Sequence, residues 1–206
     1  MRKLIKVCGM TDAGNIRAVE ALGVDLMGFI FYPKSPRRCR ELPAYLPSTA
    51  ARTGVFVDAD LATISEKCRE FGLDWVQLHG HETPGFCREV AALGVKVSKA
   101  LGVGCAADVE VARAYQDCCD MMLFDTHTPG YGGSGEAFDW SVLDGYDGHL
   151  PFLLSGGLSA ANAAQAAAFR HPRLAGYDLN SRFESAPGIK DIELIETFIQ
   201  TVYEQD

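Results

Sequence analysis

Eight short apolar runs that alternate with helix-like segments predict that this sequence folds as an α/β protein, a single-domain (β/α)8 TIM barrel over residues 1–206. The runs end near residues 7, 31, 57, 78, 101, 124, 154 and 179, at intervals of 21 to 30 residues, which leaves room for one helix after each strand. No low-complexity linker divides the chain. A doubly wound open sheet is the alternative, but it commonly has fewer strands and needs no such even spacing.

Each predicted strand is a run of apolar residues short enough for a strand buried on both faces. The eight runs cover residues 4–7, 26–31, 54–57, 75–78, 95–101, 121–124, 152–154 and 176–179. Pro33 and Pro36 forbid a regular element directly after the second run.

The predicted helices are recognised by capping residues and by their apolar pattern. A helix to residue 22 begins after Thr11 or Asp12, and a helix to residue 71 begins after Asp58 or Asp60. Ser159 caps an alanine-rich helix. The other predicted helices cover residues 82–93, 107–116, 160–169 and 189–203, with short helices around residues 45 and 140.

Composition and charge restrict the class of protein. A net charge of −8 argues against a general nucleic-acid binder, although a local pocket can still hold an anionic small molecule. No stretch approaches the ~20 apolar residues of a membrane span, and the first apolar run is too short for a signal peptide. Seven cysteines without a CxxC pair predict free thiols in a reducing compartment and no zinc site. We therefore expect a cytoplasmic protein without a metal or cofactor, which acts as a monomer or homodimer.

The active site of such a barrel gathers at the carboxyl ends of the strands, so the residues there decide the function. Asp125 follows the sixth apolar run and precedes a loop with glycines at 130, 132, 133 and 135. An acid facing a loop that can approach a ligand closely is a catalytic candidate. The alternative is an N-cap aspartate before a flexible surface loop.

Three other strand ends add candidates. Cys8 is either a small buried hydrophobe or, at the barrel mouth, a thiolate base. Arg37 is a solvated cation or, in a loop stiffened by prolines, a carboxylate clamp. Gln77 and His79 are two residues apart and therefore point to the same side of the fourth strand, at the mouth.

The seventh and eighth loops form a candidate anion site. Gly156 and Gly157 lie between the seventh strand and its helix, and a paired glycine is otherwise a tight turn. Asn180 or Ser181 can cap a short helix before Pro187, and phosphate sites in such barrels often use these two loops. Asp178 lies beside them at the end of the eighth strand, as a substrate-binding candidate.

These residues together resemble the phosphoribosylanthranilate isomerase family of tryptophan biosynthesis. The matching segments occur at every strand except the fifth, and as a set they are highly specific. They are residues 6–11, 29–37, 54–58, 76–80, 124–126 with 132–135 and 138–140, 154–158, and 177–181 with 187–191. Arg182 and Phe183 depart from the commoner pattern, in which a small and an aliphatic residue stand next to the phosphate loop.

The resemblance implies a role for most of these positions. Cys8 matches the general base and Asp125 the general acid of an Amadori rearrangement, in which N-(5-phosphoribosyl)anthranilate becomes 1-(2-carboxyphenylamino)-1-deoxyribulose 5-phosphate. Arg37 matches the residue that meets the anthranilate carboxylate. Gly156, Gly157, Asn180 and Ser181 match the residues that bind the substrate phosphate.

Two other sugar-phosphate barrel enzymes and one inactive protein are the alternatives. An indole-glycerol-phosphate synthase needs a catalytic lysine at a strand end, and Lys99, which has no acid nearby in the sequence, is the only candidate. A pentose-phosphate epimerase needs metal-binding His and Asp residues at several strand ends, which are missing. A catalytically inactive barrel that binds a phosphorylated ligand would not need both Cys8 and Asp125.

Overall fold

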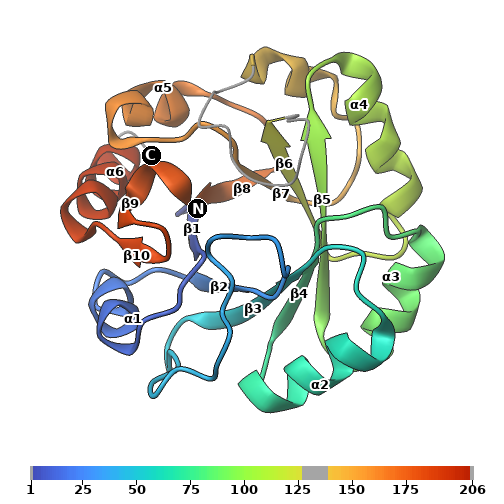
Figure 1. Cartoon of the computed structure of the whole chain (residues 1–206). Coiled ribbons are helices and arrows are strands. Elements are labelled where there is room, and N and C mark those ends of the chain that lie inside the picture. The colour runs from blue at the N-terminus through green and yellow to red at the C-terminus, as the bar shows by residue number, and fades with distance from the viewer. Residues whose placement is uncertain (1, 127–138, 205–206) are drawn as a thin grey trace.

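Eight parallel strands hydrogen bond in chain order and close into a barrel, with β1 pairing with β8 (Figure 1). The computed structural model describes residues 2–126 and 139–204. Closure confirms the predicted (β/α)8 architecture and excludes the open sheet, which has two unpaired edges. The strands are β1 (Leu4–Cys8), β2 (Leu26–Ile30), β3 (Ala51–Phe56), β4 (Trp75–Leu78), β5 (Lys96–Val103), β6 (Met121–Thr126), β7 (Phe152–Leu154) and β8 (Leu174–Leu179).

Helices lie around the outside of the barrel (Figure 1). Local capping explains where two of them begin, because Asp12 and Asp60 each accept a hydrogen bond from the backbone N–H three residues later. The α-helices are α1 (Ala13–Glu20), α2 (Leu61–Phe71), α3 (Pro84–Ala91), α4 (Ala106–Glu110), α5 (Ala163–Ala168) and α6 (Ile192–Glu204). The 3₁₀ helices are η1 (Val111–Tyr115), η2 (Trp140–Gly145), η3 (Ala160–Asn162) and η4 (Ser181–Phe183).

The predicted short helix around Tyr45 is wrong. Pro43 and Pro47 interrupt this segment, and no helix forms between β2 and β3. The Glu20 carboxylate instead accepts hydrogen bonds from the Tyr45 hydroxyl and from the backbone N–H of Ser48. A side chain from the preceding helix therefore orders this loop.

The predicted closing helix also starts later than expected. Two short antiparallel strands, β9 (Glu184–Ala186) and β10 (Ile189–Lys190), form a hairpin after β8, and α6 begins only at Ile192. The expected short helix after Asn180 is present as the single turn η4. The hairpin matters for function because it places two charged side chains, Glu184 and Lys190, behind the barrel mouth.

Several charged side chains are buried in the barrel, each with an opposite charge beside it. Lys6 and Lys99 are both 1% exposed, and their Nζ atoms lie 2.8 Å from Asp178 and 3.1 Å from Glu82. Pairing is the condition under which such burial is tolerated. Within residues 2–126 and 139–204, no helix is both long and apolar enough to cross a membrane.

Candidate active site

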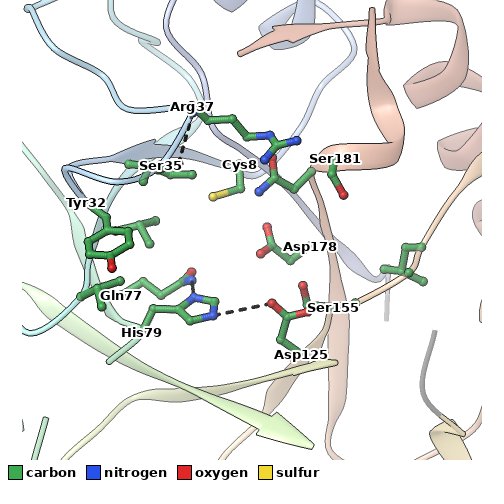
Figure 2. Close-up of a pocket in the computed structure, with 17 residues that line it drawn as sticks. Cys8, Tyr32, Ser35, Arg37, Gln77, His79, Asp125, Ser155, Asp178 and Ser181 are labelled. Carbon is green, nitrogen blue, oxygen red and sulfur yellow. Dashed lines mark hydrogen bonds and ion pairs between the residues drawn. The ribbon is translucent and has the colours of Figure 1, made fainter. Parts of the chain in front are cut away.

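One pocket lies at the carboxyl ends of the strands and contains all ten side chains and glycines predicted from the sequence (Figure 2). The empty space between its walls, including the open mouth, is about 800 Å³. The predicted residues in its lining are Cys8, Arg37, Gln77, His79, Asp125, Gly156, Gly157, Asp178, Asn180 and Ser181. Sequence reasoning did not assign Tyr32, Ser35 and Ser155, which line the same pocket.

The thiol of Cys8 lies at the end of β1, two residues after Lys6 and therefore on the same side of the strand. Lys6 and Asp178 are register partners on β1 and β8, and their ion pair is buried beneath the thiol. Gly28 is the register partner of Cys8 on β2, and a Cβ there would lie 2.6 Å from the Cys8 Sγ. A glycine at this position gives the thiol its space.

Burial and charge act in opposite directions on the pKa of Cys8. Burial raises this pKa above the ordinary thiol value, and Asp178 raises it further, while the Lys6 and Lys190 cations partly offset both effects. Burial also disfavours the charge on Lys6, but Asp178 and Cys8 outweigh that cost and raise the pKa of Lys6. Lys6 is therefore a permanent positive charge next to the thiol.

Gln77, His79 and Asp125 lie in a row across the pocket, and the first two are hydrogen-bonded (Figure 2). The Gln77 Nε2 lies 3.0 Å from the His79 Nδ1, and the His79 Nε2 lies 3.6 Å from the Asp125 Oδ2. Burial, with a contribution from Lys99, lowers the pKa of His79 to about 4. His79 is therefore neutral at pH 7, with Nδ1 accepting from the Gln77 amide and the Nε2–H facing Asp125.

Asp125 lies near the end of β6, where its Oδ1 accepts a 2.8 Å hydrogen bond from the Thr126 backbone N–H. Burial raises the pKa of this carboxyl group, while the Thr126 N–H, the Lys6 charge and the Ser155 side chain oppose the rise. A Cβ at Gly156, which has φ of 76°, would lie 2.9 Å from the Asp125 Oδ1. Only glycine allows the seventh loop to approach the acid this closely.

Arg37 is held from behind by the β9–β10 hairpin. Its Nε donates to both oxygens of Glu184, at 3.0 and 2.8 Å, and Glu184 in turn accepts from the Lys190 Nζ at 2.6 Å. Figure 2 shows the guanidinium on the same side of the pocket as Cys8 and Ser181. Within the described part of the chain Glu184 holds the guanidinium through Nε alone, which leaves the two terminal nitrogens facing the pocket side for a ligand. Sequence reasoning missed Glu184 and Lys190, because neither lies at the end of a barrel strand.

The seventh and eighth loops lie side by side at the pocket rim, as expected for an anion site. Gly156 and Gly157 have φ of 76° and 67°, which other residues rarely adopt. The Asn180 side-chain oxygen accepts from the Lys190 Nζ at 2.9 Å, which fixes the eighth loop. Among the described residues, none accepts a hydrogen bond from the backbone N–H of Gly157 or Ser181.

Comparison with known proteins assigns this chain to a family. A sequence model of N-(5'phosphoribosyl)anthranilate (PRA) isomerase matches residues 5–201. The chain belongs to the PRA isomerase family. It is 48% identical over 196 residues to the isomerase of Phocaeicola vulgatus, with 95% of this chain and 96% of that relative covered. The isomerase of Parabacteroides distasonis is 45% identical, with coverage of 97% and 93%.

Solved structures of PRA isomerases have the same fold over the whole chain. The crystal structure of the enzyme from Thermotoga maritima superposes with a TM-score of 0.87 at 36% identity, covering 99% of this chain and 100% of that one. A PRA isomerase in complex with reduced 1-(o-carboxyphenylamino)-1-deoxyribulose 5-phosphate gives a TM-score of 0.83 at 32% identity, again with 99% and 100% coverage.

Lys99, the candidate lysine of the synthase alternative, does not line this pocket. Its Nζ donates to the carbonyl oxygens of Leu78, Gly80 and Ala100 and to the Glu82 carboxylate, so the acid that the local sequence lacks is supplied across space. These contacts give the Lys99 amine a structural role. The predicted glycine loop at 130–135 lies outside the described residues, so its expected approach to Asp125 stays a prediction.

Proposed function

We propose that this chain catalyses the Amadori rearrangement of N-(5'-phosphoribosyl)anthranilate to 1-(2-carboxyphenylamino)-1-deoxyribulose 5-phosphate, with Asp125 as the general acid and Cys8 as the general base. The observation that supports it best is an acid and a thiol from different strands in one pocket, in a chain of this family. Burial raises the pKa of Asp125, which is the direction that a general acid needs.

The reaction needs an acid and a base for its proton transfers and no electron acceptor. Asp125 gives its proton to the ribose ring oxygen, the C1–O bond breaks, and a protonated Schiff base forms with the anthranilate nitrogen. Cys8, as the thiolate, then removes the proton from ribose C2, which gives an enolamine. The enolamine tautomerises to the ketone product, so substrate and product have the same composition. General acid and base catalysis of this kind typically contributes about 10²–10⁴-fold each.

The rest of the pocket would position the substrate. The terminal nitrogens of Arg37 fit the anthranilate carboxylate, because Glu184 holds only Nε and leaves a planar fork of donors. The phosphate would accept hydrogen bonds from the backbone N–H of Gly157 and Ser181 at ~2.7–3.2 Å. Gln77, His79 and Asp178 would contact the ribose between these two ends, since all three line the same pocket.

The direct test is loss of anthranilate fluorescence after the purified protein is mixed with phosphoribosyl anthranilate. We expect turnover without an added metal or cofactor. Binding of substrate without a fluorescence change, in a folded protein, would favour the inactive-barrel alternative. A requirement for an added metal would favour the epimerase alternative.

Substitution of Gly157 by aspartate tests the phosphate loop. The added carboxylate would meet the phosphate with a like charge, and we expect substrate affinity to fall by at least about tenfold, or about 1.4 kcal/mol. The measurement is binding of inorganic phosphate and of substrate by titration calorimetry. Gly23→Asp is the matched control, because Gly23 has a similar φ of 73° and open space around it, away from the pocket. Equal phosphate affinity in both variants would place the phosphate elsewhere.

The pH dependence tests the pair of proton-transfer groups. The reactive form needs one proton on Asp125 and none on Cys8. Below the pKa of Asp125 both groups are protonated and no base is present, and above the pKa of Cys8 both are ionised and no acid is present. Between the two pKa values the pair holds one proton, and the reactive form is the one that carries it on Asp125. Because both pKa values are raised, we expect a bell-shaped profile of kcat/KM with its acid limb above pH 3.8 and its alkaline limb above pH 9.0. A single limb near pH 6.5 would instead indicate a histidine, in conflict with a neutral His79.

Two further proposals concern the oligomeric state of the chain and its location in the cell. All ten residues predicted from the sequence line one pocket of this chain. A structure of monomers generated from the dimeric isomerase of Thermotoga maritima matches this chain with a TM-score of 0.84 at 34% identity. We infer that this chain works as a monomer or homodimer in the cytoplasm. Analytical ultracentrifugation decides between the two states.

A further inference from the structure

Three cysteine side chains meet in the layer of helices around the barrel, apart from the pocket. Cys87 lies on α3, and Cys118 and Cys119 lie in the turn between η1 and β6. Their three Sγ atoms all lie within 4.8 Å of one another. None of the three cysteines lines the pocket around Cys8 and Asp125.

The spacing of the three sulfur atoms matches what one metal ion requires. Because each pair of sulfurs is at most 4.8 Å apart, an ion can be placed within about 2.8 Å of all three. A zinc–thiolate bond is ~2.3 Å long, so each sulfur has to approach by no more than about 0.5 Å. Such a shift lies within ordinary adjustment of a cysteine side chain.

The donor set selects the class of ion. Three thiols without a carboxylate in the set suit thiophilic ions such as Zn²⁺ or Cu⁺ and not Mg²⁺ or Ca²⁺. The hydrogen bond with Cys119, with a contribution from the Lys99 charge, lowers the pKa of Cys87, whereas burial raises the pKa of Cys118 and the Cys87 contact raises that of Cys119, so an ion would have to displace protons from these two thiols. Cys87 and Cys118 are buried and Cys119 is only partly buried, so the cluster lies near the surface at Cys119.

We propose that Cys87, Cys118 and Cys119 form a binding site for one Zn²⁺ ion per chain. Binding would release the three thiol protons to solvent and leave a complex with a net charge of −1. The ion would join α3 to the start of β6 and stabilise the fold, without a part in the isomerase reaction. The sequence predicted no metal site, because Cys87 is far in the chain from the other two cysteines.

The experiment is a Zn²⁺ titration of the reduced, metal-free protein, followed by X-ray absorption spectroscopy of the complex. We expect one Zn²⁺ per chain, three sulfur neighbours at ~2.3 Å and a higher Tm than that of the metal-free protein. Chelation should lower Tm and leave kcat unchanged. Less than one equivalent bound, or a kcat that depends on the ion, would overturn the proposal.

Single serine variants locate the ion. Cys87→Ser and Cys119→Ser should each weaken Zn²⁺ binding by at least about 100-fold, since even partners of metal ligands are worth 10–100-fold. Cys68→Ser is the matched control, because Cys68 is a partly buried cysteine on α2 outside the cluster. Serine at the buried Cys87 can unfold the protein, so the partly buried Cys119 provides the deciding variant, checked by circular dichroism. Retained binding in folded Cys119→Ser, or binding lost in Cys8→Ser, would contradict the assignment.

Discussion

Substitution of Cys8 by alanine will lower kcat by a factor of about 10²–10⁴ while the affinity for a product analogue stays within about tenfold. Alanine removes the only group at the end of β1 that can take the proton from ribose C2. It also leaves the Lys6–Asp178 ion pair and the Arg37 clamp in place. The measurement is single-turnover fluorescence, with calorimetric binding of the reduced product analogue that a related isomerase binds.

An alanine substitution at a second buried cysteine is the control that distinguishes loss of the catalytic base from loss of side-chain packing. Cys39 is 4% exposed and lies outside the pocket, so Cys39→Ala removes a similar volume without touching the reaction. We expect a lower Tm and an unchanged kcat for this variant. If Cys8→Ala were as active as Cys39→Ala, the base would have to be another group.

The strands could be predicted from the sequence because each is an apolar run flanked by turn residues. Fully buried parallel strands have this pattern, and even spacing then implies closure. The strand ends in turn locate the site, since every barrel strand delivers its last side chains to the same rim. This geometric rule is why residues as distant in the chain as Cys8 and Asp125 could be placed in one pocket before any contact was known.

The contacts that support the site could not be predicted, because they join distant segments through single side chains. Arg37 and Glu184 are 147 residues apart, and no local pattern marks Glu184 as its partner. Lys99 has no acid among its neighbours in the chain, yet Glu82 meets it 3.1 Å away. The start of α3 at Pro84, by contrast, has a local cause, because the Thr83 side chain caps the helix by accepting from the Phe86 N–H and proline suits the first helical position.

The second large effect is expected for Asp125→Asn, with kcat lowered by about 10²–10⁴-fold. An amide has nearly the shape of a carboxyl group, and its oxygen can still accept the hydrogen bond from the Thr126 N–H. It has no acidic proton to give to the ring oxygen, so ring opening should become rate-limiting. Asp147→Asn is the control, because Asp147 is exposed and pairs with Arg113 on the surface.

Two isotope effects measured on each variant, one from D₂O as solvent and one from deuterium at ribose C2, assign the two steps. In Asp125→Asn the slow step is proton delivery to the ring oxygen, so the rate should fall in D₂O and be insensitive to deuterium at ribose C2. In Cys8→Ala the slow step is removal of the C2 proton, so deuterium at C2 should slow the reaction. A primary isotope effect at C2 in Asp125→Asn, equal to that in Cys8→Ala, would mean that Asp125 does not act in ring opening, and the acid would then have to be sought elsewhere in the pocket.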